Sequence, residues 1–322
     1  MVRRNISVLG LLWVLSGCAG SGADEAECVR GSECASGVCS DGRCYTPSGG
    51  AGGGAGLAGA GGASAGAGGG GAAGSGSGGA AAGGSGGTTT CLPNQDGQIE
   101  RSEVPLAAGL NAKFLVAQNA TFATSGTTAG DGSRTWDLTV ALAGDHLALV
   151  ETQPLAGKWF AGSFSGASYA TELAEGSDLL GVFEITGQAL LLRGVVSPTG
   201  GATRTELSYS PPVVVLDFPL TLSKSWATTS TVSGVAQGIA AFYTEKYETT
   251  VDADGTLKTP FSDFAVLRTR TTLTRTVGLL VTTLRSFAFT TECFGTVATV
   301  RSKDNEPSVE FSQAAEVRRL SP

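Results

Sequence analysis

Apolar and polar residues alternate along much of the chain from residue 91 onward. The stretches 134–152, 240–260 and 264–278 follow this alternation and are rich in Thr, Val and aromatic residues. A period of two places successive side chains on opposite faces of a strand, and β-branched and aromatic side chains pack well in sheets. These stretches therefore predict β-strands.

Small polar residues and glycines separate the predicted strands. Two apolar runs flank residues 186–188, which predicts a β-hairpin. The Gly-Asp pair at 144–145 predicts a second hairpin within 134–152. The run 240–260 is expected to end in an Asp-Gly turn at 254–255, with Asp252 as a further turn former.

Only residues 169–180 and 100–105 have a short helical pattern. The fold class expected for residues 91–322, here called the β-domain, is therefore mainly β. Its strands are expected to form an antiparallel β-sandwich or an incomplete β-barrel.

Residues 48–90 form a linker that is composed almost wholly of Gly, Ala and Ser. Such a segment has few side chains that could repay the entropy of ordering, so we expect a disordered tether. About 43 residues of this composition have a typical end-to-end distance of roughly 35 Å.

The chain begins with the pattern of a secretory signal, expected to cover residues 1–17. Arg3 and Arg4 precede an apolar run at 6–15, which is too short to span a bilayer. The following Leu-Ser-Gly-Cys at 15–18 resembles the lipobox of bacterial lipoproteins.

The lipobox resemblance implies cleavage before Cys18 and attachment of lipid to its sulfur, with the membrane as partner through this anchor. An Ala rather than an Asp at position 19 resembles the signal for the outer membrane. The expected location is an outer-membrane lipoprotein of a Gram-negative-type bacterium, facing the periplasm or the cell surface.

The chain has 7 cysteines, and the six besides Cys18 suit an oxidising compartment. Residues 18–47 hold four of them and resemble short Dickkopf- or EGF-like Cys-rich modules of secreted bacterial proteins. These four are Cys28, Cys34, Cys39 and Cys44. Three disulfide connectivities are open to them, and a zinc site is the alternative. The remaining two, Cys91 and Cys293, are predicted to form a disulfide.

Residues 209–226 and 247–271 resemble a pattern of uncharacterised secreted bacterial β-rich proteins. The pattern has a Tyr-x-Pro opening at Tyr209, a Phe-Pro-Leu stretch at 218–220, and a strand that runs into Gly-Thr-Leu at 255–257. Related periplasmic domains adopt a half-barrel like that of the lipoprotein carriers that shuttle acyl chains. The resemblance therefore implies the same fold option and a hydrophobic ligand.

Residues 92–103 resemble half of an EF-hand calcium loop around Gly97. The candidate ligands are Asn94, Asp96, Gln98 and Glu103. The first ligand position holds Leu92, which has no side-chain oxygen. No cofactor is expected for the protein, and calcium is the candidate at this loop. The alternative interpretation is an Asx/Gly turn that leads into a short helix.

Arg268 and Arg270 lie two positions apart on a predicted strand and therefore share one face. Glu245 or Glu248 on the preceding strand is expected to oppose them. The pair is a candidate site for an anion such as a lipid headgroup, and a solvated strand face is the alternative.

Candidate catalytic residues are sparse. His146 is the one histidine, and no known catalytic motif surrounds it, so we expect a surface residue near a turn. The net charge of −7 argues against a nucleic-acid partner.

The sequence therefore favours a non-enzymatic lipoprotein whose β-domain is a binding or scaffold module, with a hydrophobic ligand or a protein as its candidate partner. Two alternatives stay open. One is a carrier of lipid or another hydrophobic ligand, and the other is a hydrolase with an unrecognised site.

Overall fold

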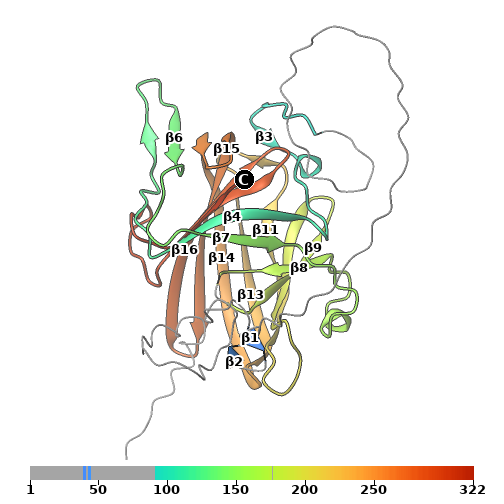
Figure 1. The fold of residues 1–322 in the computed structure, drawn as a ribbon. Helices are drawn as coiled ribbons and strands as arrows, with labels where there is room; N and C mark the ends of the chain where they lie inside the picture. Colours follow the sequence, from blue (N-terminus) through green and yellow to red (C-terminus); the bar gives the residue numbers. More distant parts are fainter. Residues whose placement is uncertain (1–38, 41–42, 45–90, 176) are drawn as a thin grey trace, which may run out of the picture. The chain divides into compact units, whose positions relative to one another are not determined.

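The computed structural model describes residues 39–40, 43–44, 91–175 and 177–322 (Figure 1). The predicted signal peptide, Cys18, Cys28, Cys34 and the linker lie outside these residues. The chain divides into two units, residues 1–82 and 83–322. Of the first unit, the described part is a two-stranded antiparallel sheet that pairs β1 (Cys39–Ser40) with β2 (Arg43–Cys44).

The second unit is built almost wholly of strands, and its described residues contain only two short 3-10 helices, η3 (Arg101–Glu103) and η4 (Ala161–Ser163). No helix among the described residues is long and apolar enough to cross a membrane. The strands are β3 (Gln98–Ile99), β4 (Asn111–Gln118), β5 (Thr127–Thr128), β6 (Arg134–Asp137), β7 (His146–Glu151), β8 (Tyr169–Glu172), β9 (Leu180–Ile185), β10 (Ala189–Val196), β11 (Glu206–Asp217), β12 (Leu220–Thr221), β13 (Ser225–Ala236), β14 (Ile239–Lys258), β15 (Asp263–Val277), β16 (Leu280–Thr291), β17 (Gly295–Ser302) and β18 (Ala314–Leu320).

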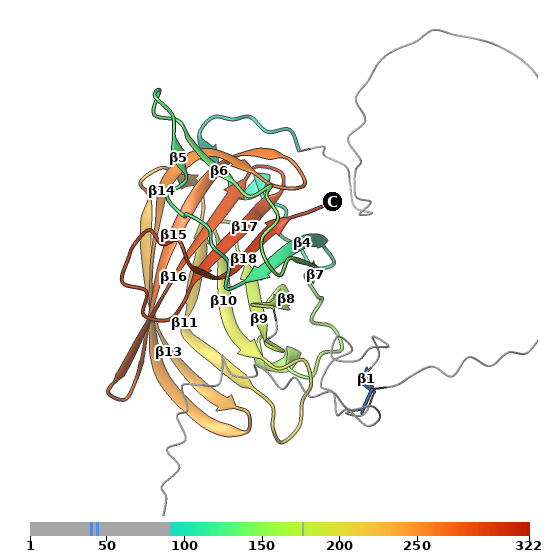
Figure 2. The ribbon, with the colours of Figure 1, turned by 60° about the vertical axis from the view of Figure 1, so that its left-hand side comes forward.

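One continuous antiparallel sheet organises the domain. Its strand order is β7-β4-β18-β17-β16-β15-β14-β13-β11-β10-β9-β8. The sheet curls until its first and last strands approach each other, where a bridge joins Gln153 to Ala170 (Figures 1 and 2). The expected mainly β fold is confirmed, and of the two architectures the nearly closed barrel is the one formed.

Apolar side chains from β8 to β15 form the inner core of this barrel. The members that face inward include Phe183, Leu192, Val213, Val232 and Val251. Directly paired residues of neighbouring strands share a face, so the core continues across the sheet from strand to strand.

The segment 91–106, here called the cap, covers one end of the inner core. Its strand β3 pairs with β12, and its Ile99 and Val104 are buried against the core beside Phe218 and Leu220. The cap therefore shields that end of the inner core from solvent.

The outer face of β14–β18 is also apolar and is covered by residues 119–145 and 303–313, here called the outer cover. Trp136 lies fully buried there with its ring edge-to-face on Phe289, at a centroid distance of 5.0 Å. Its indole N–H donates to the Thr124 carbonyl at 2.8 Å. A second outer core around Phe160 and Phe164 covers β8–β10.

Three local predictions were wrong. Residues 169–180 contain β8 rather than a helix, and β6 pairs with β14 and β5 instead of forming a hairpin with β7. The Asp-Gly pair at 254–255 lies inside β14. Gly255 is required there because a Cβ would lie 2.2 Å from the Arg134 carbonyl oxygen of β6. The hairpin at 186–188 is confirmed by the pairing of β9 with β10.

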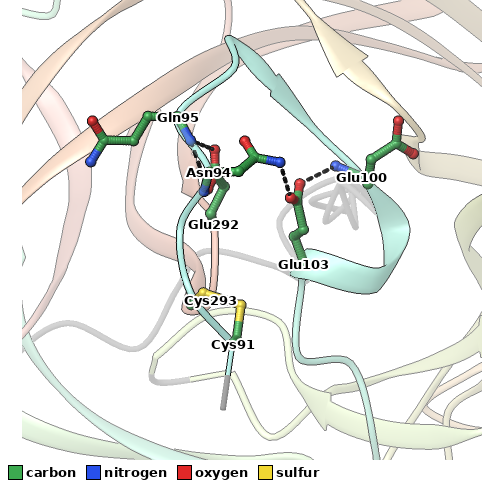
Figure 3. The surroundings of a disulfide bond; sticks show 7 residues. All are labelled: Cys91, Asn94, Gln95, Glu100, Glu103, Glu292 and Cys293. Carbon is green, nitrogen blue, oxygen red and sulfur yellow. Dashed lines mark hydrogen bonds between the residues drawn. A yellow bond between two sulfur atoms is a disulfide. The ribbon is translucent and has the colours of Figure 1, made fainter. Parts of the chain in front are cut away.

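A disulfide joins the cap to the end of β16, as the sequence predicted. It links Cys91 to Cys293 across 202 residues. Next to it, Glu292 accepts hydrogen bonds from the backbone N–H groups of Asn94 and Gln95, at 2.6 Å and 3.1 Å (Figure 3). The start of the domain is thus held by a covalent bond and a buried carboxylate.

Replacing both Cys91 and Cys293 by Ser is expected to lower the free energy of unfolding by about 5 kcal/mol, because the disulfide closes a very long loop in the unfolded chain. Guanidinium denaturation of both proteins without reductant measures the difference. A difference below about 1 kcal/mol would show that the bond constrains little of the unfolded chain.

Candidate functional site

A buried ion pair lies on the inner face near the end of the barrel opposite the cap. Glu245 of β14 and Arg275 of β15 are direct cross-strand partners. Glu245 is fully buried, and its Oε1 accepts a 2.7 Å hydrogen bond from Arg275 Nε. Its Oε2 accepts a 2.6 Å hydrogen bond from the Tyr247 hydroxyl. Both carboxylate oxygens are therefore engaged.

Tyrosines surround this pair. The guanidinium of Arg275 lies 5.5 Å from the centre of the Tyr243 ring. Burial and the nearby Glu245 raise the pKa of Tyr243 to about 12. Burial also raises the pKa values of Tyr209 and Tyr247 well above their usual value. All three hydroxyls are therefore protonated at neutral pH. We call these three tyrosines with Glu245 and Arg275 the arginine–tyrosine cluster.

Arg275 stays protonated, and Nε is the one group of its guanidinium that donates a hydrogen bond to a described residue. Burial opposes that charge, yet Glu245 and the tyrosines raise the pKa of Arg275 above its usual value. None of the described residues accepts a hydrogen bond from its two Nη groups, and its side chain is 26% exposed. A guanidinium held through Nε presents the geometry that binds a carboxylate or phosphate in a bidentate manner.

Apolar side chains continue from the arginine–tyrosine cluster into the inner core. Val232 is fully buried in the same group as Tyr209, Tyr243 and Tyr247. Leu273 and Leu284 face each other across β15 and β16 on the inner face and are half-buried. The Arg275 guanidinium thus adjoins an apolar wall that solvent partly reaches.

The wall formed by β15–β18 is more polar. Arg301 and Arg318 share the carboxylate of Glu316, at 3.4 Å and 3.6 Å. The pairing register places them on the same face of the sheet as Val251. Burial and the neighbouring Arg318 lower the pKa of Arg301 despite Glu316. The half-buried hydroxyl residues of this wall are Thr271, Ser286 and Thr299.

The predicted anion-binding pair, Arg268 and Arg270, lies on the opposite, outer face. Arg268 is 1% exposed and donates two 2.9 Å hydrogen bonds to Asp252. It also donates to Glu310 at 2.7 Å and to the Thr124 carbonyl at 2.6 Å. With these partners its guanidinium fastens the outer cover to the sheet and is not available to a ligand.

The expected partners of these arginines were wrong. Arg268 lies opposite Ala253 and Arg270 opposite Thr250. The reason is that β14 runs on to Lys258, so the chain turns at 259–262 instead of 254–255, and Arg268 pairs with Ala253 next to Asp252, which was expected to be a turn former. Glu245 opposes Arg275 instead. The alternation Tyr243-Glu245-Tyr247 on one strand face was the available signal for the cluster.

The candidate calcium ligands form two tight turns and the start of a helix, and Figure 3 shows Asn94 and Glu103 of this set. Asn94 Oδ1 accepts from the Asp96 N–H at 2.9 Å, and Asp96 Oδ1 accepts from the Gln98 N–H at 2.8 Å. Glu103 accepts from the Asn94 amide at 2.7 Å and from the Glu100 N–H at 2.8 Å. These contacts form an Asx/Gly turn and a short helix, as the alternative interpretation expected, and calcium binding stays a prediction. The described residues contain no group of three or more His, Cys, Asp or Glu side chains that could hold a metal ion.

A pocket of about 240 Å³ lies beside the cap and was not foreseen from the sequence. Phe261, Phe264 and Phe294 line one side of it and pack against each other at centroid distances of 5.1–6.3 Å. The side chains of Phe261 and Phe294 are exposed.

His146 begins β7 at the seam where the sheet closes. Its Nδ1 contacts the Gly144 carbonyl at 2.9 Å, and its Nε2 contacts the carboxylate of Glu175, which follows β8. The hydrogen bond to Gly144 and the charge of Glu175 raise the pKa of His146. The side chain is 47% exposed, as expected for a surface residue.

No family model matches the chain, and no curated protein or solved structure matches it either. The arrangement of its own residues is therefore the basis for a functional proposal.

Replacing Arg268 by Met is expected to lower the free energy of unfolding by about 3–5 kcal/mol, because Asp252 and Glu310 would both lose the buried guanidinium that binds them. Arg270→Met is the matched control. Its side chain is 33% exposed and lies 3.8 Å from the same carboxylate, so we expect at most about 1 kcal/mol. Urea denaturation of the three proteins checks this, and equal losses in both variants would contradict it.

The His146–Glu175 contact is expected to stabilise the fold at acidic pH. Because folding raises the pKa of His146, its contribution is complete below the unfolded value and is lost as the pH rises through the folded value. The stability difference between the native protein and His146→Gln should thus be larger at about pH 5.5 than at about pH 8.5. A pH-independent difference, measured by urea denaturation, would exclude a charged His146 in the contact.

Proposed function

We propose that the β-domain is a non-enzymatic binding domain that carries a ligand with a hydrophobic body and an anionic group. The ligand's hydrophobic part lies against the inner core, and its anionic group binds Arg275. Of the interpretations left open by the sequence, this is the carrier of lipid or another hydrophobic ligand.

The observation that carries the proposal is the free edge of the Arg275 guanidinium on the inner face. Glu245 holds the Nε side of this group and leaves both Nη groups for a carboxylate or phosphate. The Tyr243 hydroxyl, whose pKa is about 12, is available as a further donor. Hydrogen bonds that involve ionised partners are stronger than neutral ones, so one such anchor orients an otherwise apolar ligand.

The proposed cellular setting follows from the N-terminal sequence. Cys18 is the proposed acylated residue, the Cys-rich module of residues 18–47 follows it, and the linker joins both to the β-domain. The protein is accordingly proposed to act at the outer membrane, where lipids and other amphiphiles are abundant.

Replacing Arg275 by Gln is expected to weaken binding of oleate at least about tenfold, since a charge-assisted hydrogen bond contributes about 1.5–3 kcal/mol. Oleyl alcohol, which has the same chain and no charge, should bind both proteins equally. Isothermal titration, below the micellar concentration of oleate and below the solubility limit of oleyl alcohol, measures both affinities.

Arg270→Gln is the control for the loss of an arginine, because Arg270 is similarly exposed and lies on the outer face. It should bind oleate as the native protein does. Unchanged oleate affinity in a folded Arg275→Gln protein would overturn the assignment of Arg275. The absence of binding of both ligands by the native protein would overturn the carrier function.

A further inference from the structure

Two neighbouring β-hairpins expose apolar side chains at their turns. The β13–β14 turn exposes Ile239 and Phe242, the latter 75% exposed, and the β15–β16 turn exposes a fully accessible Leu279 followed by Leu280 and Val281. We call residues 235–242 and 276–281 the hairpin tips. No charged residue occurs in either.

The hairpin tips lie at the same end of the barrel, opposite the cap. Strands β14 and β15 pair up to Thr244 and Thr276, and both turns extend beyond that pair. Figures 1 and 2 show the long β13–β16 strands reaching one end of the domain, with β3 of the cap at the other in Figure 1. Arg275 lies four positions from Leu279, so the arginine–tyrosine cluster is at the end that carries the tips.

We propose that the hairpin tips dock on the lipid bilayer to which the chain is anchored. This inference rests on the anchor at Cys18 and on the carrier role proposed above. An uncharged, apolar surface gains free energy when its side chains enter the interfacial region of a bilayer, about 5–10 Å deep. Entry is limited to this depth because turn backbone groups require water or polar partners.

The length of chain before the domain fits this occupant. Cys293, which is bonded to Cys91, lies 13 residues after Leu280, so the tip is at most about 45 Å from it. The composition of the linker of about 43 residues predicts a typical reach of roughly 35 Å. The two lengths are comparable, so a chain anchored at Cys18 is long enough for the hairpin tips to contact the bilayer.

Docking in this orientation would give the proposed carrier direct access to its ligand. It places the end of the inner face that carries Arg275 next to lipid headgroups, so an amphiphile can pass between bilayer and barrel with a short path through water. The ligand class implied is an anionic lipid or fatty acid from that bilayer.

The test uses the chain from residue 18 with Cys18→Ser, so that no acyl group contributes to binding. Vesicles of phosphatidylcholine and of phosphatidylethanolamine with phosphatidylglycerol are the probes, and sedimentation measures partitioning. The triple variant Ile239→Ser, Phe242→Ser and Leu279→Ser is expected to partition at least about tenfold less onto both vesicles.

The matched control replaces Leu147 and Leu149, two exposed leucines of β7 away from the tips, by Ser. The control should partition as the parent does. Equal partitioning of parent and triple variant, or an equal loss in the control, would overturn the proposal. A parent dimer that the triple variant lacks, seen by sedimentation velocity without vesicles, would also overturn it in favour of self-association.

Oleate titration in the absence of vesicles separates this inference from the carrier function. The triple variant should bind oleate with the parent's affinity, because its changes lie outside the arginine–tyrosine cluster. Vesicle binding without oleate binding would leave bilayer docking supported and the carrier function overturned.

Discussion

A sheet that curls on itself while remaining apolar on both faces must bury two surfaces at once. The inner face of this domain meets that requirement by packing against itself and against the cap. The outer face of β14–β18 has no second sheet to cover it, so two chain excursions lie over it instead. Arg268 and Arg319 fasten that cover, because each donates from the sheet to carbonyl and carboxylate oxygens of the covering segments.

Charge is distributed differently on the two faces. On the outer face, the buried Arg268 pairs with Asp252 and Glu310, and these ion pairs attach the outer cover to the sheet. On the inner face, Glu245 engages only one side of Arg275 and leaves the terminal nitrogens without a partner among the described residues. Burying a charge is costly unless it is fully paired. Arg275 is partly accessible to solvent, and the proposal assigns its terminal nitrogens to an anionic ligand.

The sequence predicted the structure correctly where a local pattern or the number of cysteines was sufficient. The hairpin around residue 187 and the pairing of Cys91 with Cys293 were both foreseen. The predictions failed where contacts with backbone far away in the sequence decided the local structure. Gly255 was expected in a turn, but it lies in β14, where the Arg134 carbonyl of β6 leaves no room for a Cβ. The arginine–tyrosine cluster was missed because β14 continues past the expected turn at 254–255 to Lys258, which moves the partner of Glu245 along β15 to Arg275.

The sequence by itself determined that the second unit is β-rich, that two cysteines bracket it, and that the chain before it is rich in Gly, Ala and Ser. These properties depend on composition, alternation and cysteine count, which are local or additive. Only the tertiary structure decided which face each arginine occupies and that both hairpin tips extend past the same end. Strand register and sheet closure depend on pairings between residues far apart in the chain, and a shift of one residue moves a side chain to the other face.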